Sequence, residues 1–309
     1  MGLYIYLPIA GNSVHILLLL GLGGLVGLLS GLFGVGGGFL LTPLLIMIGI
    51  PPTVAAASDS NQIVAASASG TFAHYRLGNV DFKMGILLLI GGVTGGTFGV
   101  QVVKILRSLG NADFVIKITY VVMLALIGGY MFLESLRNLR QGEIKEPKKE
   151  TSKPSLYARI IKKLPAKTDF PKSGVRISIL LPLILGILVG ILAAIMGVGG
   201  GFIMVPIMVY LLRMPMHVVV GTSLFQIFFT CVDVTIMQSY LNHTVDFILA
   251  LLLLLGSTTG AQIGARISKR LKADQIKILL AIIVLAVMVK MLLGLIISPH
   301  ILLSYKGGH

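Results

Sequence analysis

The chain has 309 residues, of which 56% are hydrophobic and only 12% are charged. A soluble domain of this size carries about twice that charged fraction, so the composition argues against a soluble protein. The net charge of +14 would suggest a nucleic-acid partner in a soluble protein, but here the cations gather in loops between apolar blocks, where membrane topology explains them and no nucleic-acid partner is expected.

Ten hydrophobic segments follow one another along the chain. About 20 apolar residues span a bilayer as a helix, and the blocks lack the alternating pattern of a transmembrane β-barrel. The predicted fold is therefore an all-α polytopic membrane protein in which some helices are short or broken. The first half contributes segments 14–32, 38–50, 54–75, 83–104 and 114–136, and the second half contributes 177–196, 201–213, 217–241, 246–268 and 274–297.

A segment of different composition separates the two halves. Residues 137–176 hold twelve Lys and Arg with four acids, and they contain no apolar run long enough to span a bilayer. We interpret them as an exposed basic linker, within which 156–164 forms either an amphipathic helix on the headgroups or a disordered loop. The predicted organisation is a first transmembrane repeat at 1–136, this linker, and a second transmembrane repeat at 177–309.

The two halves are related by duplication. The segment Gly34–Phe39 (GVGGGF) recurs unchanged as Gly197–Phe202, 163 residues later, and at the same offset Ser60 aligns with Ser223. An ordered series of matches over a long stretch indicates an internal repeat. The further matches are Pro43 with Pro206, Pro52 with Pro215, Val80–Asp81 with Val245–Asp246, Gly95 with Gly260 and Gly99 with Gly264.

The distribution of cations predicts the orientation of each half. If each half crosses five times and the linker is cytoplasmic, 20 of the 25 Lys and Arg lie inside and four lie outside. By the positive-inside rule this favours a multi-pass protein of the plasma (inner) membrane with a cytoplasmic linker. Five is odd, so the halves would be inverted repeats, as in many secondary transporters. The alternative is four full crossings and a re-entrant segment in each half, which would make the repeats parallel.

The segment that follows each glycine motif is short for a membrane span. The 13 residues from Gly38 to Ile50 cover about 20 Å as a helix, whereas the hydrocarbon core is about 30 Å thick. We therefore predict a helix break inside the membrane, with the N–H groups and positive end of the next helix binding an anion. The alternative is that the glycines only permit close helix packing. The predicted binding glycines are Gly34, Gly36, Gly37, Gly38, Gly197, Gly199, Gly200 and Gly201.

Polar residues follow each short segment. The first half carries the run SDSNQ at 58–62, and the second carries GTS at 221–223 with Gln226 beyond it. Polar groups are costly inside a bilayer, so they usually face the bundle interior or a cavity, although hydrogen bonds between helices are the alternative. Asp59 and Asp233 are candidates for proton coupling, again with a structural hydrogen bond as the alternative. The predicted binding residues of this set are Ser60, Asn61, Gln62, Thr222, Ser223 and Gln226.

These motifs resemble a known family. An apolar helix running into GVGGGF, then Pro43 or Pro206, then a serine-bearing helix (ASDSNQ or GTSLFQ), is similar to the TauE/SafE sulfite exporters, also called TSUP permeases. The first half departs from the family pattern at Ser58-Asp59, where Gly or Ala followed by Thr is more usual. The resemblance implies a secondary transporter, and more narrowly an exporter, of small sulfur-containing anions such as sulfite or organosulfonates.

Two other classes of function stay open as alternatives. One is an anion channel, although the chain lacks repeated rings of charge at the ends of a pore. The other is a membrane enzyme or a non-transport assembly subunit. The hydrophobic segments contain no HExxH, CxxC or Gly-x-Ser-x-Gly motif and no Walker motif. We therefore expect no enzymatic activity, no cofactor and no metal, with a small anion and membrane lipid as the partners.

Overall fold

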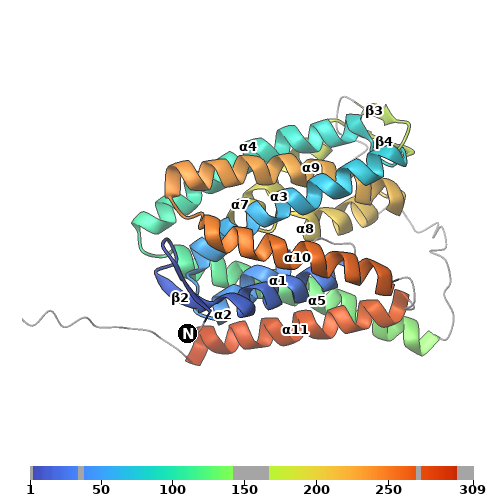
Figure 1. Cartoon of the computed structure of the whole chain (residues 1–309). Coiled ribbons are helices and arrows are strands. Elements are labelled where there is room, and N and C mark those ends of the chain that lie inside the picture. Colours follow the sequence, from blue (N-terminus) through green and yellow to red (C-terminus); the bar gives the residue numbers. More distant parts are fainter. Residues whose placement is uncertain (1–2, 34–37, 142–166, 269–272, 298–309) are drawn as a thin grey trace, which may run out of the picture.

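The computed structural model describes residues 3–33, 38–141, 167–268 and 273–297, and it is a bundle of helices (Figure 1). The predicted all-α polytopic fold is confirmed. Among the described residues, five helices are long and apolar enough to cross a membrane. These five are Phe82–Ser108, Ala112–Leu133, Met216–Asn242, Phe247–Gly264 and Ile278–Ile296.

Each half consists of a short β-hairpin followed by five helical stretches. The first half contains β1 (Tyr4–Leu7), β2 (Asn12–His15), α1 (Ile16–Phe33), α2 (Gly38–Met47), α3 (Pro52–Arg76), α4 (Phe82–Ser108) and α5 (Ala112–Gln141). The second half contains β3 (Lys167–Phe170), β4 (Val175–Ser178), α7 (Leu180–Met196), α8 (Gly201–Pro206), the π-helix η1 (Ile207–Leu211), α9 (Met216–Met237), the π-helix η2 (Gln238–Asn242), α10 (Phe247–Ser268) and α11 (Ala273–Ile297).

The two hairpins are absent from the expectations based on sequence. Tyr4 pairs with His15 in one hairpin, and Lys167 pairs with Ser178 in the other. These registers are 163 residues apart, which is the offset of the glycine motifs, so the duplication includes the hairpins. Residues 167–176 were predicted to belong to the linker, but the structure pairs them as the first element of the second half. Strands of four residues are too short to stand out against neighbouring apolar helices.

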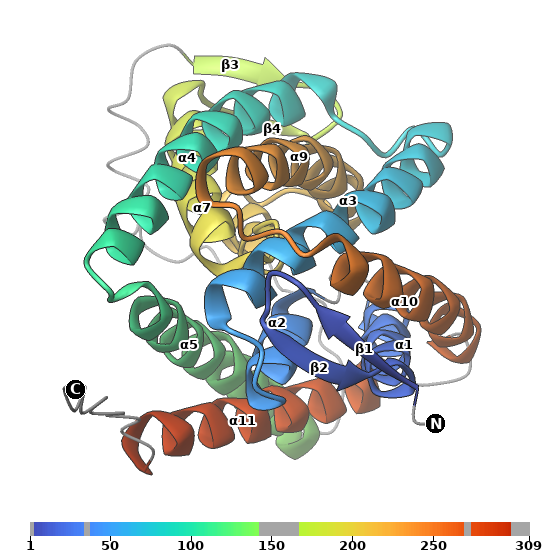
Figure 2. The same cartoon turned by 60° about the vertical axis from the view of Figure 1, so that its left-hand side comes forward.

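The helices of the two halves are interleaved. The first helix of each half packs against the fourth helix of the other half, so that α1 lies along α10 and α7 lies along α4. The third helices α3 and α9 pack on each other, and so do the fifth helices α5 and α11, which lie along one edge of the molecule (Figure 2). The two hairpins lie at opposite ends of the bundle (Figure 1), and the halves are therefore inverted relative to each other.

Glycines allow the interleaved pairs to approach closely. A Cβ added to Gly95 on α4 would overlap the carbonyl oxygen of Ile187 on α7, and a Cβ added to Gly260 on α10 would overlap that of Gly24 on α1. Small residues at such crossings let helix backbones come together without a larger side chain between them. The glycines of the fourth helices therefore act in packing.

Candidate functional site

The second glycine motif forms a sharp break between α7 and α8. Gly197, Gly199 and Gly200 have φ angles of 72°, 68° and 75°, in the left-handed region that side chains disfavour. The break is also crowded, because a Cβ on Gly197 would overlap the carbonyl oxygen of Ala56 on α3. Both the backbone conformation and the lack of space require glycine here, and the predicted helix break is present.

The last residues of the two motif copies lie against each other. Gly34, Gly36 and Gly37 lie outside the described residues, while Gly38 is buried and opens α2. Phe39 and Phe202 are the last residues of the two motifs, and their rings stack with centroids 4.5 Å apart and planes 5° apart. Since these residues are equivalent in the repeat, the stack marks the pseudo-twofold axis. The N-terminal ends of α2 and α8 therefore lie beside each other.

A buried carboxylate lies next to the start of α2. The Asp59 side chain is fully buried, and its Oδ2 accepts a hydrogen bond from Thr42 Oγ1 at 2.8 Å. A Cβ added to Gly38 would come within 3.3 Å of the same Oδ2. Within the described part of the chain, Oδ1 has no hydrogen-bond partner. Leaving a buried carboxylate oxygen unpaired is costly, so this position is suited to a proton or to a ligand that donates a hydrogen bond.

The hydrogen bonds of α3 and α9 correct the predicted repeat register. Ser58 Oγ accepts the backbone N–H of Asp246 at 3.1 Å, and Thr222 Oγ1 accepts that of Asp81 at 3.0 Å. Asp81 and Asp246 are repeat equivalents, so Ser58 corresponds to Thr222 at an offset of 164.

The predicted alignment of Ser60 with Ser223 is therefore wrong by one residue, and Asp59 is the equivalent of Ser223. One of the two extra residues of the second half lies before Thr222 and the other after it, which explains the intermediate offset. The glutamines fit the same register. Gln62 donates to Ser257 Oγ at 2.5 Å, and Gln226 lies against Gly92, which is the equivalent of Ser257.

Several predicted binding residues already have partners in their own helix. Ser60 donates to the carbonyl of Ala56, and Ser223 donates to that of Val220, as serines in helices commonly do. Asn61 is partly exposed. Gln226 likewise donates to Thr230 one turn further along α9, but the Oε1 atoms of Gln226 and Gln62 are buried without a partner among the described residues.

The second candidate acid lies in a different environment. Asp233 is partly buried on α9 and accepts a hydrogen bond from Thr97 Oγ1 of α4 at 3.2 Å. A Cβ on Gly96 would approach its Oδ2 to 3.1 Å. Asp233 therefore lies at the interface of α4 and α9, whereas Asp59 lies between α2 and α3.

Two residues at the centre were not singled out from the sequence. Thr42, on α2, is fully buried and holds Asp59. Tyr120, on α5, is also fully buried, and its hydroxyl donates to the carbonyl oxygen of Met196, the last residue before the second glycine motif. A tyrosine in an apolar segment, whose hydroxyl needs a partner when buried, was the only available signal for this contact.

Aspartates fix the hairpins at the two ends of the bundle. Asp246 caps α10 through Leu249 N, and its Oδ2 accepts the N–H groups of Ile9 and Ala10 in the tip of the β1–β2 hairpin at 3.1 and 3.4 Å.

Its equivalent, Asp81, caps α4 through Met84 N and accepts the backbone N–H and hydroxyl of Ser173, in the β3–β4 hairpin, at 3.1 and 2.5 Å. Each hairpin is thus tied to a helix of the opposite half. Through Ser58 and Thr222, the same aspartates also bind the central helices α3 and α9.

One known protein family matches most of the chain. The model of the family described as sulfite exporter TauE/SafE matches residues 19–291, which include both glycine motifs. The chain belongs to the TauE/SafE family. The resemblance drawn from the glycine motifs and the residues after them is confirmed, and the TauE/SafE match runs through both interleaved halves.

Relatives of this TauE/SafE protein are described as membrane transporters. The probable membrane transporter protein YunE of Bacillus subtilis (strain 168) is 25% identical over 288 residues, which cover 89% of this chain and 96% of that protein. The probable membrane transporter protein YjnA of the same strain is 29% identical over 276 residues, covering 88% and 97%.

A plant relative carries the family name. Sulfite exporter TauE/SafE family protein 1 of Arabidopsis thaliana is 33% identical over 100 residues, which are 32% of this chain and 22% of that protein. No solved structure matches. The family and these names indicate a multi-pass membrane transporter rather than an enzyme.

Proposed function

We propose that this TauE/SafE protein is a secondary transporter that exports small sulfur-containing anions such as sulfite or organosulfonates. It works by alternating access around a central site formed by the two glycine breaks. The observation that carries the proposal is the contact between the last residues of the two motif copies, the stacked rings of Phe39 and Phe202. Inverted repeats with broken helices at their interface are the common plan of secondary transporters.

The ends of the short helices favour an anion as substrate. A helix N-terminus carries unpaired N–H groups and a partial positive charge of about half a unit. Two such ends beside each other, with buried polar side chains close by, can replace the hydration shell of a small oxyanion. The proposed binding residues are Gly34, Gly36, Gly37, Gly38, Ser60, Asn61, Gln62, Gly197, Gly199, Gly200, Gly201, Thr222, Ser223 and Gln226.

Asp59 provides a physical reason for coupling to protons. Its carboxylate lies beside the start of α2, where an anionic substrate would also be attracted. Two negative charges at one buried position repel each other, so the anion binds well only when Asp59 is protonated. The unpaired Oδ1 can carry that proton. Asp233 stays the second candidate, since it is partly buried and has a single hydroxyl donor among the described residues.

The cations favour one orientation in the plasma membrane. Arg76, Lys83, Lys172 and Arg213 lie at or near the ends of elements at the β3–β4 end of the bundle. Because positive residues stay on the cytoplasmic side, we place this end, and with it the linker, in the cytoplasm. Lys104, Arg107 and Lys117 lie at the opposite, outer end.

Flux measurements on purified protein in liposomes test the function. We expect labelled sulfite or an organosulfonate to cross at the rate of a carrier, and an imposed proton gradient to change the net flux. Absence of flux for every sulfur oxyanion offered would contradict the proposed substrate class. Electrical currents far above the turnover of a carrier would show a channel instead.

A further inference from the structure

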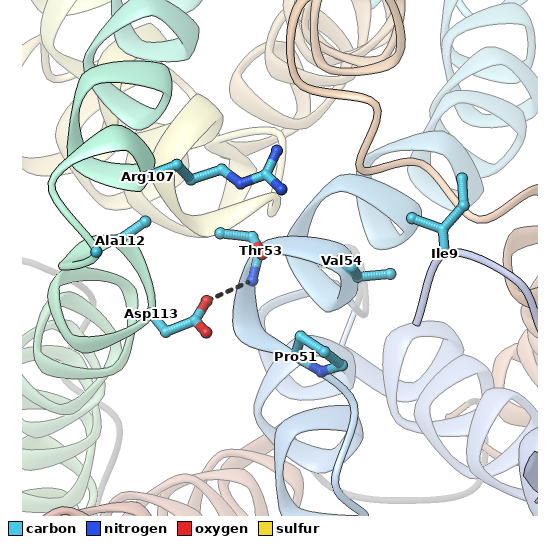
Figure 3. A pocket seen from close by; sticks show the side chains of 8 residues that line it. Ile9, Pro51, Thr53, Val54, Arg107, Ala112 and Asp113 are labelled. Carbon is cyan, nitrogen blue, oxygen red and sulfur yellow. Dashed lines mark hydrogen bonds between the residues drawn. The ribbon is translucent and has the colours of Figure 1, made fainter. Parts of the chain in front are cut away.

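A cavity of about 310 Å³ opens at the β1–β2 end of the bundle, apart from the two glycine breaks. Three helix ends and the hairpin tip meet around it (Figure 3). Arg107, Thr53 and Asp113 supply its polar groups. The other residues that line it are Ile9, Pro51, Val54, Gly110 and Ala112.

Arg107 is held in place while most of its donors stay available. One guanidinium nitrogen, Nη1, donates to the carbonyl oxygen of Asn242 in η2. The guanidinium makes no other hydrogen bond or ion pair within the described part of the chain, and the side chain is exposed, so a ligand can reach its remaining N–H groups. A guanidinium has five donors in a rigid fork that fits the oxygens of a carboxylate, sulfonate or phosphate. Its anchoring to η2 lowers the entropy cost of ordering it around a ligand.

The one carboxylate in the cavity bonds to a helix start instead of to Arg107. Asp113, in the first turn of α5, accepts the backbone N–H of Thr53 at the start of α3 at 3.3 Å (Figure 3). Its carboxylate therefore lies at two helix N-termini, each worth about half a positive charge. These two ends stabilise the carboxylate of Asp113, which is exposed. Arg107 and Asp113 are not within ion-pair distance, since the one ion pair among the described residues joins Arg176 and Asp169. The guanidinium of Arg107, in the last turn of α4, is therefore not paired with the one carboxylate of the cavity.

We infer that this cavity is a second binding site for a small oxyanion, with the Arg107 guanidinium as its main ligand, at the mouth of the transport route. The inference rests on the proposed function, because it takes the transported anion as the occupant. The cavity lies at the beginning of α3, the helix that carries Asp59 less than two turns further along. An anion at Arg107 is thus close to the central site and still accessible from the β1–β2 side.

Sulfite uptake into liposomes tests the site, with the anion added outside and the flux measured over a range of concentrations. We expect Arg107→Gln to raise the half-saturating sulfite concentration about tenfold, as for the loss of one charge-assisted hydrogen-bonded contact. The matched control is Lys104→Gln, which removes an exposed cation one turn earlier on α4 and outside the cavity lining. The control variant should keep the affinity of the wild-type protein.

Asp113→Asn should change the half-saturating sulfite concentration in the opposite direction, which a folding defect would not do. An asparagine can still accept the Thr53 N–H, but the negative charge is gone, so the half-saturating concentration should fall. Equal values for Arg107→Gln and Lys104→Gln, or weaker binding in Asp113→Asn, would overturn the mouth site while wild-type flux still supports the transporter. If the wild-type protein passes no sulfite, the proposed function itself fails.

The phosphate of an anionic lipid has the same chemistry as a free oxyanion. Liposomes of phosphatidylcholine alone and with added phosphatidylglycerol separate the two sources. If a headgroup occupies the cavity, phosphatidylglycerol will weaken sulfite binding in the wild-type protein and will have no such effect in Arg107→Gln. If free anion is the occupant, the difference in half-saturating sulfite concentration between the wild-type and Arg107→Gln proteins will be the same in both lipid compositions. Equal half-saturating sulfite concentrations for the wild-type and Arg107→Gln proteins in both lipid compositions would contradict an oxyanion site at Arg107.

Discussion

At the scale of single residues, Asp59 gives the site its asymmetry. Its repeat equivalent is Ser223, and Thr42, which holds the carboxylate, has Val205 at the matching position of the second motif region. The first half therefore contributes an acid and a hydroxyl where the second half contributes a hydroxyl and an apolar side chain. In the proposed function, a protonatable group on one side of the pseudo-symmetric site is what would let an anion and a proton bind together.

We predict that Asp59→Asn loses proton-driven accumulation of sulfite but keeps exchange of internal for external anion. The amide has nearly the same shape and can accept from Thr42, so it imitates the protonated acid permanently. Net accumulation and exchange can both be measured in liposomes with and without a pH gradient. The companion variant is Asp233→Asn. Accumulation that is normal in Asp59→Asn and absent in Asp233→Asn would move the coupling role to the α4–α9 interface.

Gly200 gives a second prediction at this scale. A leucine there would adopt a disfavoured φ of 75°, and its Cβ would overlap Val189 on α7. We expect Gly200→Leu, and likewise Gly37→Leu in the first motif, to abolish sulfite flux while folded protein is still recovered. Gly21→Leu is the control, because nothing lies within 4 Å of a Cβ at Gly21 and its φ is not positive. Normal flux in both motif variants would mean that the glycines act only in packing.

At the scale of elements, the two hairpins are held by equivalent sets of hydrogen bonds. Asp246 and Asp81 are almost fully buried, at 1% and 2% exposure. Each carboxylate binds a hairpin and a helix start, while the backbone N–H of the same residue donates to a central helix. Removing such a carboxylate leaves several backbone N–H groups without an acceptor inside the protein, and each unpaired group costs about 1–3 kcal/mol of stability. The hairpins are therefore part of the fold of the transporter rather than loose ends of its helices.

We predict that Asp246→Ala and Asp81→Ala each lower the free energy of unfolding by about 3 kcal/mol or more, since at least two buried N–H groups lose their acceptor. The control is Asp169→Ala. Asp169 forms an ion pair with Arg176 in the same β3–β4 hairpin, but both side chains are 71% exposed, and such pairs contribute about 0–1 kcal/mol. Denaturation of the purified proteins in detergent compares the three. Equal stability of all three variants would mean that the hydrogen bonds of the buried aspartates do not stabilise the fold as proposed.

The elements also show which features a single sequence could reveal. Long apolar segments predicted the helices, the repeated GVGGGF predicted two related halves, and the distribution of Lys and Arg predicted their inversion, because hydropathy, identity and charge are read directly from the chain. The predicted alignment of Ser60 with Ser223 was wrong because the second half has two separate one-residue insertions. A comparison of identical residues alone does not distinguish them from a single two-residue insertion. The cavity beside Arg107 could not be predicted, since it exists only after α3, α4, α5 and the β1–β2 hairpin converge.

At the scale of the whole molecule, neither half is a unit on its own. α1 has its main partner in α10, and α4 has its main partner in α7, so each half presents glycine-lined faces that only the other half covers. We predict that residues 1–141 and 142–309, expressed separately, are each degraded in the membrane, whereas co-expression restores folded protein and sulfite flux. Protein levels and flux in cells that express one or both fragments measure this. Stable accumulation of a single half would show that the halves fold independently.

The interleaving also determines when during synthesis the molecule can close. Phe247, the first residue of α10, is made 231 residues after Ile16, the first residue of α1. At about 5–20 residues per second, the first helix waits roughly 10 to 50 s for its partner. Throughout that interval lipid chains must cover the face around Gly23 and Gly27, which α10 later occupies. Displacement of those lipids by a helix from the far end of the chain is thus a late step of assembly, and a ribosome that stops early leaves that face of α1 exposed to lipid.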